Sequence, residues 1–301
     1  MPSSLSNRMK SRLVVLALLV VSLSFCGQRA FGQTGNRCLW AVSSGKNTVY
    51  LLGSIHLLSK REYPLPDDFE KAYRDSRVVV FETDLDQMDT PEIQTLVRRN
   101  SLLPRKTSIK DVLSIRTSRM LEAYLASKGL EMARFEGLRP WVCALTLTML
   151  ELHQRGFLPE YGVDRYFYRK AKSDRKKIIA LEPVREQLSL FFELDNAEQD
   201  AFLKRTLSDL ERVEMLFPEM LAAWKSGDVQ TLDELLRESF KEHPDLYDKF
   251  LVRRNEKWLP VIAGLIGQPE NVLVVVGASH LGGENGVIKM LVRKGFRVIR
   301  K

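Results

Sequence analysis

Two histidines and two glutamates each follow a short apolar stretch of the sequence. His56 and His280 both stand in a Gly-x-x-His-Leu motif, and Glu82 and Glu182 directly follow apolar runs. Imidazole and carboxylate groups are common ligands of divalent metal ions, and a carboxylate can also act as a general base. The motif glycines would let a ligand approach the backbone closely. Because the motif is repeated and the chain has only four histidines, we expect His56 and His280 to share one site.

Each of these residues also has a purely structural interpretation. A histidine after a strand is usually a hydrogen-bonded loop residue, and we give no role to His153 and His243, which lie in helical, polar surroundings. A glutamate at such a position can cap a helix or pair with a surface lysine. Asp164 stands where a helix is expected to begin and is expected to be an N-cap residue. The run Arg253-Arg254-Asn255 could clamp a carboxylate or phosphate, but a solvated basic face is the default expectation.

The elements that would position these residues alternate between strands and helices. Residues 38–58 predict a hairpin that runs into His56, and the apolar runs 78–81, 177–181 and 272–276 predict further strands. Helical patterns lie between them, and 296–299 predicts a last strand. This alternation predicts an α/β fold with a largely parallel sheet and helical insertions. Ligands bind at the carboxyl ends of the strands in such sheets, which is where the four residues would lie.

The mature chain is expected to be one domain. No low-complexity linker interrupts residues 33–301, and the long helical stretch at about 184–266 is interpreted as an insertion or cap. The glycine-rich segment 282–286 lacks the spacing of a phosphate-binding loop, so we do not expect a nucleotide. No Gly-x-Ser-x-Gly or His-Glu-x-x-His motif supports a serine hydrolase or a zincin.

The first 32 residues have the three parts of a secretory signal peptide. A basic segment ending at Arg12 precedes the apolar run 13–25, and Ala30-Phe31-Gly32 provides a small-x-small cleavage site. The apolar run is too short to span a bilayer. We therefore expect an exported, periplasmic or extracellular protein without a transmembrane segment after signal cleavage. A competing interpretation makes Cys26 a lipid-bearing cysteine, but the bulky Phe25 precedes it where a small residue is expected.

Net charge and cysteine content exclude some classes of partner. The net charge of +8 falls to +4 when the four basic residues of segment 1–32 are removed with the signal peptide. This mild excess forms no basic stripe with interleaved aromatic residues, so we do not expect a nucleic-acid partner. Cys38 and Cys143 remain after cleavage, and an oxidising compartment would permit a disulfide, although a buried thiol at Cys143 is favoured.

The order and spacing of several short motifs resemble the TraB/GumN family. The motifs are Leu39-Trp40, Val49 to His56, Tyr63-Pro64-Leu65-Pro66, Phe81-Glu82, Arg139-Pro140-Trp141, Gly162-Val163-Asp164, Leu181-Glu182, Arg254-Asn255 and Val276 to Leu281. The resemblance covers about residues 38–299 and implies a mixed α/β sheet related to the erythromycin-esterase (EreA-like) and ChaN-like group. This family is similar to the TIKI proteins, metal-dependent proteases that act on Wnt ligands. The resemblance implies His56, His280 and Glu82 as the counterparts of their two histidines and glutamate.

Residues and resemblance together predict an exported, metal-dependent hydrolase that acts as a peptidase on a peptide or protein substrate. His56, His280 and Glu82 would hold Mn²⁺, Co²⁺ or Zn²⁺, and Glu182 or Glu82 would act as the general base. The alternative is a non-catalytic binding protein that holds a peptide, haem or metal in the same cleft. The sequence leaves the substrate, the metal and the oligomeric state open.

Overall fold

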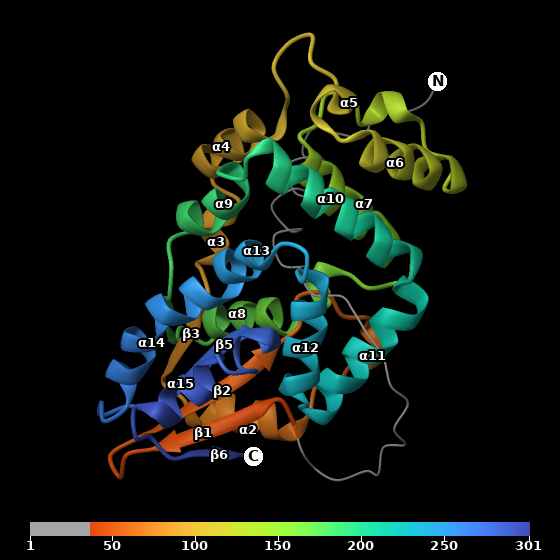
Figure 1. Ribbon diagram of the computed structural model, residues 1–301. Helices are drawn as coiled ribbons and strands as arrows, with labels where there is room; N and C mark the ends of the chain where they lie inside the picture. Colours follow the sequence, from red (N-terminus) through yellow and green to blue (C-terminus); the bar gives the residue numbers. More distant parts are fainter. Residues whose placement is uncertain (1–36) are drawn as a thin grey trace. The chain divides into compact units, whose positions relative to one another are not determined.

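The computed structural model describes residues 37–301, so the predicted signal peptide lies outside the described residues. Residue contacts divide the described chain into two compact units. The helical unit comprises Asp86–Arg155 and Val184–Glu214, and the sheet unit comprises 37–85, Gly156–Pro183 and Met215–Lys301. Figure 1 shows the helices and strands of each unit. The helices of the predicted insertion are thus shared between the two units.

The sheet unit is built on six strands in the order β4-β3-β5-β2-β1-β6. The strands are β1 (Leu39–Ser43), β2 (Thr48–Ser54), β3 (Val78–Phe81), β4 (Lys177–Ala180), β5 (Val272–Gly277) and β6 (Val298–Arg300). Strands β4, β3, β5 and β2 are mutually parallel, whereas β1 is antiparallel to both β2 and β6. The predicted α/β fold with a mixed, largely parallel sheet is therefore confirmed.

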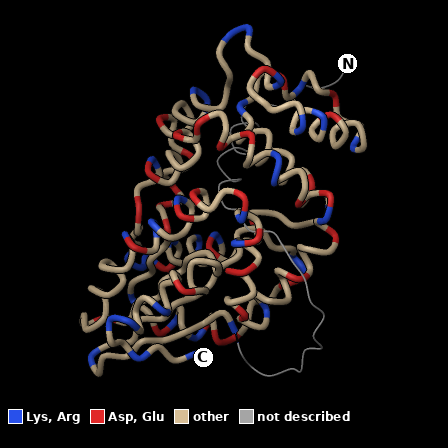
Figure 2. Tube along the Cα trace, in the orientation of Figure 1, with Lys and Arg blue, Asp and Glu red and all other residues tan. Residues whose placement is uncertain are grey.

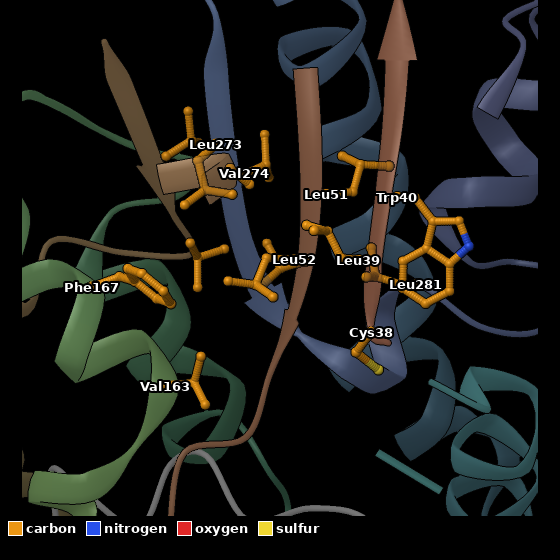
Figure 3. Packing of buried hydrophobic residues seen from close by; sticks show 14 of the residues in the cluster. Cys38, Leu39, Trp40, Leu51, Leu52, Val163, Phe167, Leu273, Val274 and Leu281 are labelled. Atoms are coloured by element: carbon orange, nitrogen blue, oxygen red, sulfur yellow. The ribbon is translucent and has the colours of Figure 1, made fainter. Parts of the chain in front are cut away.

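Burial on both faces explains the unbroken apolar runs of the central strands. Every residue of β3 and β5 is buried, as expected for parallel strands covered by helices. Helix α8 (Val163–Ser173) contacts β3 and β4, and its Val163 and Phe167 belong to the same core cluster as Leu52 and Leu273 (Figure 3). Burying each such side chain contributes about 1.5–3 kcal/mol relative to exposing it. This core holds the ends of β2, β3 and β5 in fixed positions.

Short helices complete the sheet unit. They are α2 (Asp67–Asp75), α8, α12 (Val229–Ser239), α13 (Pro244–Tyr247), α14 (Arg253–Leu265) and α15 (Val287–Arg293), with the 3-10 turns η2 (Lys60–Glu62), η4 (Pro159–Tyr161) and η6 (Ala278–His280). A π-helical turn, η5 (Asp248–Val252), leads directly into α14. π-Helical turns are rare and are frequently found at functional sites.

The helical unit contains the largely buried helix α7 (Pro140–Gln154) and several other helices. The others are α4 (Pro91–Ser101), α5 (Ile109–Val112), α6 (Ile115–Ser127), η3 (Met132–Arg134), α9 (Val184–Phe192) and α10 (Asn196–Glu211). Two helices, α3 (Leu85–Met88) and α11 (Val213–Ser226), begin in one unit and end in the other. Helix α7 is buried on nearly all sides, as its apolar sequence predicts, and it contacts α10.

Three further features concern the described chain as a whole. Between residues 37 and 301, no helix has both the length and the apolar character needed to cross a membrane. Cys38 and Cys143 are both buried free thiols, and burial raises the pKa of the Cys38 thiol to about 12, which makes it unreactive. Basic and acidic residues are interspersed along the traced chain (Figure 2).

Candidate functional site

The four residues predicted from strand ends lie at one edge of the sheet. Because β2, β3, β4 and β5 run in parallel, His56, Glu82, Glu182 and His280 follow their carboxyl ends on the same side. Parallel pairing continues past β3 and β4, where the backbone N–H of Glu182 donates to the carbonyl of Glu82 at 2.9 Å. All four side chains belong to the sheet unit. The structure therefore brings the predicted residues together.

Gly277 lies at the centre of this group. A β-carbon added to Gly277 would be 3.2 Å from Glu82 Oε1, 3.3 Å from His56 Nε2 and 3.5 Å from His280 Cδ2. The Gly277 N–H also donates to Glu82 Oε1 at 2.7 Å and so orients this carboxylate. The missing side chain leaves a small space that is bordered by two imidazole rings and one carboxylate.

Arg254, the second residue of α14, joins both glutamates and one histidine. Its Nη2 donates to Glu82 Oε2 and to Glu182 Oε1, both at 2.6 Å, and its Nε donates to Glu182 Oε1 at 3.1 Å. Its Nη1 lies 3.0 Å from His280 Nε2 and 3.1 Å from the carbonyl oxygen of Phe250, in η5. Only 11% of the Arg254 side chain is exposed. The guanidinium is therefore an internal counter-ion of the site.

A side-chain oxygen lies close to the Nδ1 atom of each imidazole ring. His280 Nδ1 is 2.7 Å from Oδ1 of the fully buried Asn255, and Asn255 Nδ2 donates to the Asn285 carbonyl at 2.8 Å. Because Arg254 can only donate, His280 Nε2 must accept and Nδ1 must carry the proton. His56 Nδ1 lies 3.2 Å from Asp164 Oδ1, and its Nε2 lies 3.9 Å from Glu82 Oε1. Both rings thus have an oxygen partner on the side facing away from the centre of the site.

Trp258 forms an apolar wall on the α14 side. Its ring centroid is 4.4 Å from that of His280, and the Arg254 Cζ atom lies 4.6 Å from the indole ring. The indole N–H donates to Glu182 Oε2 at 3.2 Å. Arg254 and Trp258 are four residues apart, so they lie on the same face of α14. One helix therefore fixes the positions of Glu182 and His280.

Burial and the charge of Arg254 shift the pKa values of the two glutamates in opposite directions. Burial alone would raise the pKa of Glu82, but Arg254 and the two histidines outweigh it and lower the pKa to about 2. Burial raises the pKa of Glu182 above its usual value, although Arg254 and Trp258 oppose this shift. Paired carboxylates whose pKa values are pushed apart commonly divide between an anionic role and an acid–base role.

The two histidines also differ in their tendency to become protonated. Burial and Arg254 lower the pKa of His280 to about 3, so its ring is neutral. Burial opposes protonation of His56 as well, but the carboxylates of Asp164 and Glu82 outweigh burial and raise its pKa. A neutral imidazole with an accepting Nε2 is the form that binds a metal ion or a hydrogen-bond donor.

The donor types at Gly277 suit a divalent metal ion, since imidazole nitrogen and carboxylate oxygen surround a space that a β-carbon would fill. Their present positions are not those of a closed ligand set. Among residues 37–301, no group of three or more His, Cys, Asp or Glu side chains lies close enough to hold a metal ion. Instead, His280 Nε2 and Glu82 Oε2 both contact the Arg254 guanidinium.

Sequence reasoning missed the residues that support the four strand-end side chains. Asp164 was expected to be an N-cap residue, but the N-cap position of α8 is Gly162, without a side-chain cap, and Asp164 contacts His56 instead. Arg253 is exposed and pairs with Asp248, as a solvated basic residue would. Its neighbour Arg254 is in the site, and no signal in the sequence distinguishes the two arginines.

The glycine-rich segment 282–286 has a packing role. A β-carbon on Gly282 would overlap the Val229 carbonyl of α12, and one on Gly283 would overlap the Asp233 carboxylate. Gly283 also has a positive φ of 71°, which favours glycine. The glycines allow the segment after His280 to approach α12 closely.

Comparison with known proteins assigns the chain to a family. The model of the TraB/PrgY/gumN family matches residues 38–300. The chain belongs to this family. The match includes all the residues of the candidate site.

Relatives in this family include bacterial and animal proteins. The uncharacterized protein YbaP of Escherichia coli is 26% identical over 261 residues, which cover 85% of this chain and 94% of YbaP. The metalloprotease TIKI1 of Danio rerio is 25% identical over 316 residues, which cover 87% of this chain and 63% of TIKI1. The metalloprotease TIKI homolog of Amphimedon queenslandica is 24% identical and covers 96% of this chain. No solved structure matches the chain significantly.

Proposed function

We propose that this family member is an exported, metal-dependent hydrolase that cleaves peptide bonds in a peptide or protein substrate. The observation that carries the proposal is the meeting of His56, Glu82 and His280 around the open side of Gly277. Similarity to metalloproteases supports the class of substrate.

His56 Nε2, His280 Nε2 and the Glu82 carboxylate would hold the cation, with Mn²⁺, Co²⁺ and Zn²⁺ as candidates. A divalent ion held by these residues would polarise a scissile carbonyl and lower the pKa of a bound water. Asn255 holds the His280 ring through Nδ1, and Asp164 lies 3.2 Å from His56 Nδ1, so Nε2 of each ring is left as the ligand atom. The low pKa of Glu82 keeps its carboxylate anionic.

Glu182 is proposed as the general base and, after proton transfer, the general acid. Burial raises its pKa, which increases the affinity of this carboxylate for a proton. In the present arrangement both Glu182 oxygens accept hydrogen bonds from Arg254 or Trp258. Glu182 therefore accepts a proton only once one of these donors has moved away.

The test is peptide cleavage by the mature chain, measured by mass spectrometry on a mixed peptide library with added Mn²⁺, Co²⁺ or Zn²⁺. The wild type should cleave peptides, and a chelator should stop the reaction. His56→Ala and His280→Ala should lose both metal binding and cleavage. Glu182→Gln should keep the metal and lose about 10²–10⁴-fold in rate. Release of the metal by Glu182→Gln would instead make Glu182 a ligand and Glu82 the base.

His153→Ala and His243→Ala are matched controls, because both histidines are exposed and lie outside the site. Both control variants should cleave at the wild-type rate. Equal cleavage by wild type and His56→Ala would exclude this site as the catalytic centre. Metal or peptide binding without turnover would favour a binding protein over a hydrolase.

A further inference from the structure

Arg254 occupies the His280 nitrogen that the proposed cation requires, and it also contacts the Glu82 carboxylate. His280 Nε2 is 3.0 Å from Arg254 Nη1, and Glu82 Oε2 is 2.6 Å from Arg254 Nη2. Because Asn255 holds His280 through Nδ1, Nε2 is the only ring nitrogen of His280 that is left for a cation. This nitrogen has one lone pair, so a guanidinium N–H and a metal ion cannot both use it.

The charge of Arg254 makes the competition stronger. A guanidinium is positively charged at every pH that a folded protein tolerates, so it cannot give up its charge when a second cation arrives. Arg254 and a divalent ion would stand beside the same two buried carboxylates, Glu82 and Glu182, which are 6% and 4% exposed. Repulsion between the two cations in this sheltered environment favours the displacement of one by the other.

The attachment of Arg254 suggests where its side chain can go. Its Nη1 donates to the backbone carbonyl of Phe250, in the π-helical turn η5 that precedes α14. Its remaining partners are Glu182, Glu82 and His280, together with the ring of Trp258. Movement of the guanidinium away from Glu82 and His280 therefore needs no break in the hydrogen bonds of the sheet.

We infer that Arg254 is a resident cation of the metal-free site, which a divalent ion must displace from His280 and Glu82 before it can bind. Arg254 thereby sets the affinity of the site for metal and holds the two buried carboxylates together when no metal is bound. This inference deepens the proposed function, because it says what limits metal binding at the site. It rests on the proposed function only in assuming that the site binds a metal ion.

The experiment is calorimetric titration of Mn²⁺ and of Zn²⁺ into the chelator-stripped mature chain. Arg254→Met should bind metal at least tenfold more tightly than the wild type, because it retains the ligands and lacks the competing charge. The metal affinity of Arg254→Lys should lie between those of the wild type and Arg254→Met, since lysine keeps the positive charge but lacks the planar guanidinium. Arg253→Met is the control, because Arg253 is exposed and pairs with Asp248, and its affinity should equal that of the wild type.

Unchanged or weaker metal binding by Arg254→Met would overturn the inference, as would the absence of binding in both this variant and the wild type. Tighter binding by Arg254→Met without peptide cleavage by any variant would retain the inference and reject the hydrolase. If His56→Ala lost peptide cleavage but Arg254→Met left metal affinity unchanged, the hydrolase would be retained and the inference rejected.

If Arg254→Met does not fold, nuclear magnetic resonance of the wild type with ¹⁵N-labelled arginine replaces the titration. The Nη1–H and Nη2–H groups of Arg254 are hydrogen-bonded to His280 and Glu82 in the metal-free site, so their exchange with water should be slow. Saturating Zn²⁺ should speed this exchange at least tenfold, with the signal assigned through Arg254→Lys. Unaltered exchange at metal saturation would show that Arg254 stays in place and would overturn the inference.

Discussion

The site needs glycine at position 277 because a side chain would fill the space between Glu82 and His56. The backbone conformation of Gly277 does not itself require glycine. Its φ of −51° and ψ of 134° are open to most residues. A methyl group at this position would sit between Glu82 Oε1 and His56 Nε2, at 3.2 and 3.3 Å. Both distances are shorter than usual contacts, so the two side chains would have to move apart by a few tenths of an ångström.

Gly277→Ala should therefore weaken metal binding at least tenfold while costing little stability. The methyl group fills the space between the proposed ligands, but it needs no change in the backbone of β5. We expect the free energy of unfolding to fall by about 1 kcal/mol or less, which lowers Tm by about 2–4 °C in a chain of this size. Calorimetric titration with Mn²⁺ and a thermal melt measure the two effects.

Gly264→Ala is the matched control for this substitution. Gly264 is exposed in α14, and a β-carbon there would meet no atom within 4 Å. Alanine should stabilise the helix by about 0.5–1 kcal/mol and leave metal affinity unchanged. If Gly277→Ala bound metal as tightly as Gly264→Ala, the ligands would not meet beside Gly277.

The sequence allowed the strand-end residues to be predicted, because an apolar run followed by an ionisable residue marks the end of a buried strand. The supporting residues could not be predicted in the same way. Arg254 and Asn255 stand next to the exposed Arg253 on one helix, and a sequence does not show which turn of a helix faces a site. Asp164 has the position of a helix-start carboxylate, and its contact with His56 depends on how α8 docks onto the sheet.

Helix α7, in the helical unit, contains a buried carboxylate among apolar side chains. Glu151 is 2% exposed and accepts a hydrogen bond from the Tyr124 hydroxyl at 2.8 Å. Lys128 Nζ and Arg155 Nη1 lie 2.7 and 2.8 Å from its oxygens. Burial alone would raise the pKa of Glu151, but Lys128, Tyr124 and Arg155 outweigh burial and lower it.

A lowered pKa in the folded state means that ionised Glu151 stabilises the fold above the usual glutamate pKa of about 4.3. This contribution is lost as the pH falls through the lower folded-state value. Glu151→Gln should therefore reduce the free energy of unfolding by about 1.5–3 kcal/mol at pH 7. The difference from the wild type should shrink towards pH 3. Urea unfolding at several pH values, followed by circular dichroism, measures it.

Glu214→Gln is the comparison for Glu151→Gln, since Glu214 also pairs with Arg155 but its side chain is 88% exposed. A surface pair of this kind contributes about 0–1 kcal/mol, so this variant should unfold almost like the wild type. A pH-independent loss of stability in Glu151→Gln would show that packing, and not the ionised carboxylate, is responsible.

Most of the elements follow from local sequence rules, and the exceptions have physical reasons. Helix α4, for example, begins after Thr90 as its N-cap with Pro91 as its first residue, a pair typical of helix starts. The π-helical turn η5 has no such sequence signal. The antiparallel position of β1 beside β6 is likewise a matter of topology, since the two strands lie at opposite ends of the chain.

At the scale of the whole molecule, the prediction of export depends on residues outside the described range. When the full chain is produced with its own leader in a bacterial host, intact-mass analysis of the exported form should show a chain that begins at Gln33. The small residues of Ala30-Phe31-Gly32 fit the cleavage site of a signal peptidase.

Ala30→Asp should block cleavage at this site and serves as its control. A lipid-modified N-terminal Cys26 would contradict the prediction and would place the protein on a membrane surface. A chain that keeps Met1 would contradict export itself.

The π-helical turn before α14 has a consequence for the permitted length of the chain. Each residue turns an α-helix by about 100°. Deleting one residue within Asp248–Val252 would restore a regular α-helix and rotate α14 by about that angle relative to α13. Arg254 and Trp258 would then face away from Glu182, even though no residue of the site had been altered. Insertions and deletions should therefore be tolerated at the exposed hairpin turn around Gly45 and be absent from this five-residue segment in functional relatives.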